Sequence, residues 1–169
     1  MQRLLEALKH DDLVSLSKLL DMGIDPNQDV LVGEEYDIDD PDEVPLLFYA
    51  IGNNVSIDAI SMLAEAGMDI TYKTREGIGA VDIAIKSHRG DVLRLCMDRG
   101  MDITSSSRRS GMTPVILAAS FGDIDMVKFL LENGSSLSER DKNGFGAMDY
   151  AIRLGHKKMV EFLEKQETS

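Results

Sequence analysis

Four kinds of residue in this chain of 169 amino acids could carry chemistry: paired glycines, histidines, one cysteine and a dense run of acids. Gly77-Ile78-Gly79 and Gly144-Phe145-Gly146 match part of a phosphate-binding loop. Such a loop needs a third glycine and a strand before the following helix, and neither segment has them. The two segments are 67 residues apart, which is two periods of the repeat described below. We therefore interpret both as equivalent turns of a repeat.

The histidines and the cysteine form no recognisable cluster. His10, His88 and His156 are too scattered to pair with one another or with Cys96. His10 and His156 fall in turns between helices, where we expect a hydrogen bond to a helix end or to the backbone. Cys96 falls on the apolar face of a helix, which favours a buried, unreactive thiol. Because no metal-binding spacing such as Cys-x-x-Cys occurs, the sequence predicts no catalytic residue, no metal and no cofactor.

The acidic run has two interpretations. Seven of the ten residues in Glu34–Glu43 are acidic, and Pro41 stands among them. A calcium loop would need a turn glycine, which this run lacks. A solvated loop and a contact for a basic partner both stay open.

Composition narrows the class of protein. The chain is 43% hydrophobic and 28% charged, as folded proteins are, and its net charge of −12 argues against nucleic-acid or anionic-membrane binding. No segment approaches the roughly 18 apolar residues of a membrane span, and the first residues lack the apolar run of a signal peptide. The single cysteine suits a reducing compartment. We therefore expect a cytoplasmic protein.

The stretch Thr113–Gly134 predicts two short antiparallel helices. Thr113 is a suitable N-cap and Pro114 a suitable first helical residue, and Gly122 ends the first helix. The second helix carries apolar residues at helical spacing and ends at Gly134. Those apolar residues are Ile124, Val127, Leu130 and Leu131. Because such a pair cannot bury its apolar face alone, it requires neighbours.

Three columns of residues show that the pair recurs. Alanines at positions 50, 84, 118 and 151 are 34, 34 and 33 residues apart. Glycines at 67, 100 and 134 are 33 and 34 apart, and those at 77, 111 and 144 are 34 and 33 apart. A period of 33 to 34 residues in three separate columns predicts an array of equivalent helix pairs.

A Thr-Pro start, this period and the closing glycine together resemble the ankyrin repeat family. The best matches are Gly111–Gly134, Asp141–Gly144 and Gly155-His156; Ile116 replaces the usual histidine, and Gly79-Ala80 and Gly146-Ala147 replace Thr-Pro. The resemblance implies an all-α ankyrin-repeat solenoid of about five helix-turn-helix units with hairpin-like loops. We divide the chain into an N-terminal capping repeat (1–28), an acidic loop insertion (29–43), three repeats (44–76, 77–110 and 111–143) and a C-terminal capping repeat (144–169).

In this family partners usually contact the concave side, which is made of hairpin tips and the exposed face of each first helix. Carried over by register, the resemblance implies partner-binding positions of two kinds. The basic and polar ones are Arg75, Lys86, Arg109, Ser120, Lys142 and Arg153, and the apolar ones are Ile78, Met112, Phe121, Phe145 and Leu154. We name Arg75, Arg109 and Lys142 the basic column, and Ile78, Met112 and Phe145 the apolar column.

From this segregation we predict a monomeric protein that is not an enzyme and that binds a partner protein through a basic and apolar concave face. The partner would present apolar and acidic side chains, and the protein would act as a scaffold, adaptor or inhibitor. One alternative is that the apolar column only packs between neighbouring hairpins. Another is a small-molecule sensor or enzyme with a cleft that the sequence does not reveal.

Overall fold

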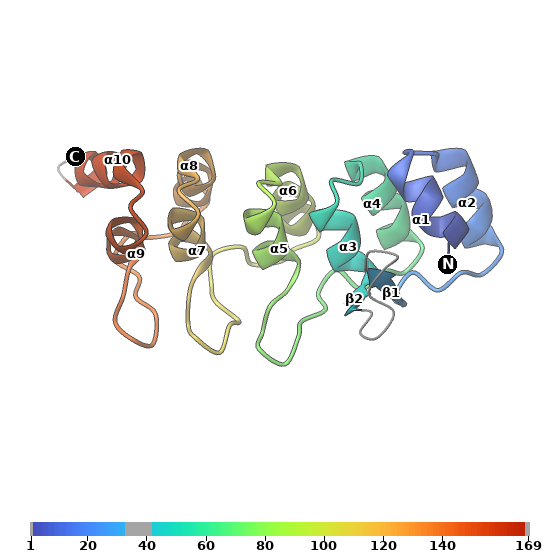
Figure 1. Cartoon of the computed structure of the whole chain (residues 1–169), viewed down its shortest axis with the longest axis horizontal. Coiled ribbons are helices and arrows are strands. Elements are labelled where there is room, and N and C mark those ends of the chain that lie inside the picture. Colours follow the sequence, from blue (N-terminus) through green and yellow to red (C-terminus); the bar gives the residue numbers. More distant parts are fainter. Residues whose placement is uncertain (1, 33–41, 168–169) are drawn as a thin grey trace. The chain divides into compact units, whose positions relative to one another are not determined.

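The computed structural model describes residues 2–32 and 42–167, which are mostly helical and confirm the predicted helix pairs (Figure 1). The pairs are α1 (Gln2–Lys9) with α2 (Leu13–Asp21), α3 (Leu46–Gly52) with α4 (Ile57–Glu65), α5 (Ala80–Lys86) with α6 (Gly90–Asp98), α7 (Pro114–Ser120) with α8 (Ile124–Glu132), and α9 (Ala147–Arg153) with α10 (Lys157–Glu167). The chain divides into two compact parts, Met1–Tyr72 and Lys73–Ser169. Each part is described by itself below.

The N-terminal part contains a short antiparallel ribbon that the sequence does not predict. β1 (Asp29–Val32) pairs with β2 (Asp42–Pro45), so that Val30 stands opposite Val44. The predicted loop over 29–43 is therefore wrong at its two ends. The ends pair because Val30 is β-branched and completely buried, which anchors the strand against the helices. Most of the acidic run, residues 34–41, lies outside the described residues, and its two interpretations stay open.

Each turn between paired helices has one residue in the left-handed backbone region. In the last two pairs this residue is Gly122 or Gly155, with φ of +70° and +73°. In the first three pairs the same place is taken by Asp11, Asn54 and His88, with φ of 53° to 56°. Asn, Asp and His tolerate this backbone region better than other side chains do. These three turns therefore do not need a glycine at the left-handed position.

The helix that follows each turn begins with a side-chain cap in three of the pairs. Oxygens of Asp12, Ser56 and Asp123 accept the backbone N–H three residues later at 3.0, 3.1 and 2.9 Å. Thr113 occupies the N-cap position of α7, as predicted, and Pro114 follows it. The Thr113 hydroxyl makes no capping hydrogen bond, however, and lies buried without a partner. For α7 the pre-set backbone of Pro114 is therefore the stronger start signal.

In the C-terminal part, α5, α7 and α9 lie side by side with buried alanines between them (Figure 1). The period alanines Ala84, Ala118 and Ala151 have no exposed surface. Small side chains at these positions let neighbouring helices approach closely. Cation–π contacts connect the second helices of neighbouring pairs. Arg94 lies 5.2 Å from the Phe129 ring centroid, and Lys128 lies 5.7 Å from that of Phe162.

The loops before α5, α7 and α9 extend away from the helices on one side (Figure 1). In the first and third of these loops a hairpin is closed by backbone hydrogen bonds of 2.9 Å, from Thr74 N to Ile78 O and from Asp141 N to Phe145 O. Gly77 and Gly144 occupy equivalent turn positions with φ of +78° and +82°. The Gly-x-Gly segments are thus turns, as the repeat period predicts.

Substituting the two turn glycines should separate backbone strain from crowding. Gly144→Ala places a Cβ in open space at a left-handed φ, so we expect a loss of about 1–2 kcal/mol in the free energy of unfolding. Gly77→Ala adds a Cβ 1.7 Å from the Ser107 carbonyl oxygen of the next loop, so its loss should be clearly larger. Urea unfolding followed by circular dichroism measures both, and equal losses would contradict the close approach of the two loops.

The reactivity of Cys96 should report unfolding. The thiol is 1% exposed on α6, and burial raises its pKa to about 11. Because the thiolate is the reactive form, Ellman's reagent near pH 8 should leave the native protein unlabelled and label it rapidly in urea. Rapid labelling of one thiol per chain without denaturant would show that this part of the core opens readily.

Candidate partner-binding face

Backbone hydrogen bonds join neighbouring hairpin loops of the C-terminal part. Arg109 N donates to Glu76 O at 2.9 Å, and Lys142 N donates to Ser110 O at 3.0 Å. Ser107 Oγ adds a bond of 2.8 Å to Gly77 O. These bonds bring together the loops that carry the basic column, and all three basic side chains of that column are exposed.

The apolar column is half-buried along the same loops. Ile78, Met112 and Phe145 are each partly covered. Phe145 packs edge to face on Tyr150, with ring centroids 6.2 Å apart, and the guanidinium of Arg153 lies 4.5 Å from the Phe145 centroid. Phe145 therefore also packs against side chains of its own repeat. The ring follows the hairpin turn directly, and this places it over the first helix of its own pair.

A groove of about 430 Å³ lies between the hairpin of residues 141–146 and helices α7 and α9. It is lined by Met112, Ser120, Asn143, Phe145, Tyr150, Arg153 and Leu154. Five of the eleven predicted positions therefore share one hollow. The other six, Arg75, Ile78, Lys86, Arg109, Phe121 and Lys142, lie outside its lining, and among them Phe121 is 40% exposed.

Sequence reasoning missed two residues of the groove, Asn143 and Tyr150. Tyr150 lies three residues before Arg153 on α9, so the two side chains share a helix face. That spacing was visible in the sequence and could have identified the tyrosine. Asn143 was visible only as a hairpin-tip position.

Asp141 holds the hairpin beside the groove. Its Oδ2 accepts a 2.6 Å hydrogen bond from the Tyr150 hydroxyl, and its Oδ1 accepts the backbone N–H groups of Asn143 at 2.8 Å and Phe145 at 3.0 Å. The Tyr150 hydrogen bond is the main cause that lowers the pKa of Asp141, and the same bond raises the pKa of Tyr150. The buried carboxylate thus remains ionised and fixes the aromatic wall of the groove.

Three basic side chains of the C-terminal part, all outside the predicted set, form ion pairs: Arg108 with Asp82, Arg89 with Asp91 at 2.7 Å, and Lys128 with Asp125 at 3.8 Å. Within residues 2–32 and 42–167, no such ion pair is found for the five basic residues of the predicted set, Arg75, Lys86, Arg109, Lys142 and Arg153. All five side chains are exposed, so acidic groups of a partner could reach them.

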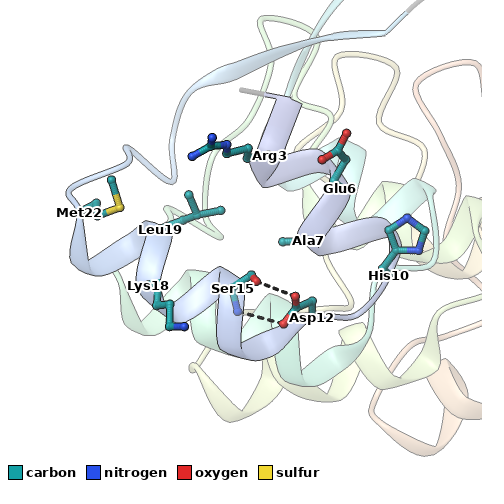
Figure 2. A pocket seen from close by; sticks show the side chains of 9 residues that line it. All are labelled: Arg3, Glu6, Ala7, His10, Asp12, Ser15, Lys18, Leu19 and Met22. Carbon is teal, nitrogen blue, oxygen red and sulfur yellow. Dashed lines mark hydrogen bonds between the residues drawn. The ribbon is translucent and has the colours of Figure 1, made fainter.

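The N-terminal part has a hollow of about 450 Å³ between α1 and α2, shown in Figure 2. Its charged side chains are of both signs, with Arg3 and Glu6 on α1, Lys18 on α2 and Asp12 at the start of α2. The hydrogen bonds drawn there join Asp12 to Ser15 and cap α2, and they lower the pKa of Asp12. The polar groups therefore serve the helix start and do not converge on a common point.

The histidines have separate roles. His156 Nε2 lies 2.9 Å from the Ser120 carbonyl oxygen, which confirms the predicted backbone contact. His88 Nδ1 lies 2.5 Å from Asp123 Oδ2 and links two neighbouring pairs. For exposed His10 no side-chain hydrogen bond to another described residue is found, and the expectation for it stays a prediction. No group of three histidine, cysteine or acidic side chains suited to a metal occurs in the described part of the chain.

None of the helices in the described ranges is long and apolar enough to span a bilayer.

Acid should remove the contribution of Asp141 to stability. A carboxyl whose folded pKa is lowered stabilises the fold above its ordinary value near 3.8, and this stabilisation is lost as the pH falls through the folded pKa. Asp141→Asn should therefore lower Tm at neutral pH, and the gap from the parent should narrow below about pH 4. Exposed Asp98→Asn is the control; a gap for Asp141→Asn that stays constant down to acid pH would contradict the assignment.

Comparison with known proteins finds similarity to proteins with ankyrin repeats. A family model for ankyrin repeats, three copies, matches residues 103–168. Alpha-latrotoxin-Lt1a of Latrodectus tredecimguttatus is 29% identical over 115 residues, which are 68% of this chain and 8% of the toxin. SH3 and multiple ankyrin repeat domains protein 2 of Homo sapiens is 24% identical over 166 residues, or 96% of this chain and 8% of that protein.

A third relative is the NF-kappa-B inhibitor cactus of Drosophila yakuba, 27% identical over 119 residues, which are 68% of this chain and 24% of that protein. The chain spans less than a tenth of the length of the latrotoxins and the human protein. Residues 103–168 thus match the ankyrin-repeat family, and the five helix pairs of the described chain are similar to the repeats for which the human relative is named.

Proposed function

We propose that this protein binds a partner protein through the basic and apolar face formed by the hairpins, α7 and α9 of the C-terminal part. Ankyrin repeats support protein–protein interaction in general, and relatives include one named as an inhibitor and one named for its SH3 and ankyrin domains. The observation that carries the proposal is the groove, in which apolar side chains adjoin Arg153, a base that has no ion pair with another described residue.

The chemistry of the face indicates the chemistry of the partner. Binding energy at protein interfaces concentrates in a few central residues, among which aromatic and arginine side chains are enriched. Phe145 and Arg153 are of these types and lie in contact at the groove. Exposed bases at the hairpin tips favour a partner segment with acidic side chains, because complementary charge speeds association and excludes basic competitors.

A preformed surface suits occlusion or recruitment of the partner. The hairpins are held to one another by backbone hydrogen bonds, so binding would require little ordering of this chain. An inhibitor would mask an active site with this face, whereas an adaptor would present the partner to a third protein. Both modes use the same contacts on this chain.

The double variant Arg109→Glu with Phe145→Ala tests the proposal. It reverses one central charge and removes the aromatic anchor, each of which should cost about 2 kcal/mol or more of binding free energy. Proteins captured from a cell extract by the parent chain are quantified by mass spectrometry against those captured by the variant. We expect at least one captured protein to be lost with the variant, while its helical circular dichroism is unchanged.

A matched control variant is Lys158→Glu with Phe162→Ala. It makes the same kinds of change on α10, where Phe162 lies under Lys128 rather than in the groove. This control should retain the captured protein. Loss of capture in both double variants, or in neither, would place the binding surface elsewhere. A further chain without residues 34–43 would show whether the acidic run takes part.

A further inference from the structure

The groove is lined mainly by apolar surface, and Arg153 is its charged lining residue. Met112, Phe145 and Leu154 supply apolar surface, and Leu154 is 54% exposed. A volume of about 430 Å³ has room for a large apolar side chain with part of its backbone. Covering exposed apolar surface of this kind lowers the free energy of the system. An apolar side chain is therefore the preferred occupant.

Arg153 is held in a position that favours a carboxylate. Its guanidinium lies over the Phe145 ring, with Cζ 4.5 Å from the ring centroid, and this cation–π contact favours that position of the group. A guanidinium stacked on a ring keeps the N–H donors at its edge free, and these match the two oxygens of a carboxylate. Stacking therefore orders the arginine before any partner arrives.

Asp141 is the acid of this chain that interacts with Arg153, but it does not occupy the donor edge of the guanidinium. Asp141 lies close enough for Arg153 to contribute to lowering its pKa, but this contribution is smaller than that of the Tyr150 hydrogen bond. Both Asp141 oxygens already accept hydrogen bonds from this chain, and the carboxylate is buried. The edge of the Arg153 guanidinium has no ion pair with the described residues.

We infer that the groove holds one apolar side chain of the partner and that Arg153 binds an aspartate or glutamate two positions away in the same segment. The inference rests on the proposed function and adds to it a short recognition element: an apolar residue with a neighbouring acid. In an extended segment, side chains two positions apart share a face roughly 7 Å apart, which lets one enter the groove while the other contacts its wall.

The test begins with random peptides displayed on phage and selected on the intact protein. We expect the enriched peptides to share a large apolar residue with an acid two positions away. For one such peptide, binding is measured by fluorescence polarisation with the parent chain, Arg153→Ala and Arg153→Lys, and with the peptide acid changed to its amide. The amide peptide should bind the parent protein about tenfold more weakly than the acid peptide does, or weaker still.

A double-mutant cycle gives the decisive result. If Arg153 binds the acid, the acid-to-amide change should have little effect once Arg153 is alanine. Arg153→Lys should also weaken binding severalfold, because lysine lacks the planar donor edge. The control Arg94→Ala removes an arginine stacked on Phe129 at 5.2 Å and should leave binding unchanged.

The outcomes separate this inference from the proposed function. Peptides that lose binding with Arg109→Glu or Phe145→Ala but show no coupling between Arg153 and their acid would overturn the inference and leave the face intact. Enriched peptides without the apolar and acidic pair would do the same. Enriched peptides insensitive to all three substitutions would overturn both, as would a selection that enriches none above the level on the Phe145→Ala protein.

Discussion

Each pair of neighbouring hairpins in the C-terminal part is joined by one backbone hydrogen bond, and the candidate face depends on these bonds. Arg109 N bonds to Glu76 O, and Lys142 N bonds to Ser110 O. The helices are stacked by apolar burial, which fixes their spacing but not the positions of the loop tips. Without the loop-to-loop bonds, the basic side chains would sit on independent loops and could not present a fixed array of charge.

The repeat separates folding residues from surface residues by position. Ala84, Ala118 and Ala151 recur with the period and are completely buried between helices. The residues next to the hairpin glycines recur with the same period and are partly or fully exposed. The surface positions can therefore differ between repeats at little cost to stability, and their charge in this chain requires an explanation other than folding.

The period of alanines and glycines was sufficient to predict the helix pairs, and the positions that the ankyrin resemblance implied include five of the residues that line the groove. The sequence failed where tertiary contacts decide. The ends of the acidic insertion pair as strands because Val30 is buried. The acidic residues near Val30 along the chain gave no indication of this burial. Phe145 stacks beneath Arg153, a contact between a loop and a helix that no local pattern specifies. The pairing of Arg108 with Asp82 likewise crosses repeats, so the sequence alone could not separate paired from unpaired arginines.

The central claim is that the partner covers the groove side of α7 and α9, and hydroxyl-radical footprinting of the complex with the captured partner tests it most directly. The side chains of Phe121, Leu154, Ile152 and Met22 are 40%, 54%, 60% and 78% exposed, so all four should be oxidised in the free protein. With partner bound, oxidation of Leu154 and Phe121 should fall severalfold while that of Ile152 and Met22 is unchanged. Unchanged oxidation of Leu154 and Phe121 in a saturated complex would contradict the account.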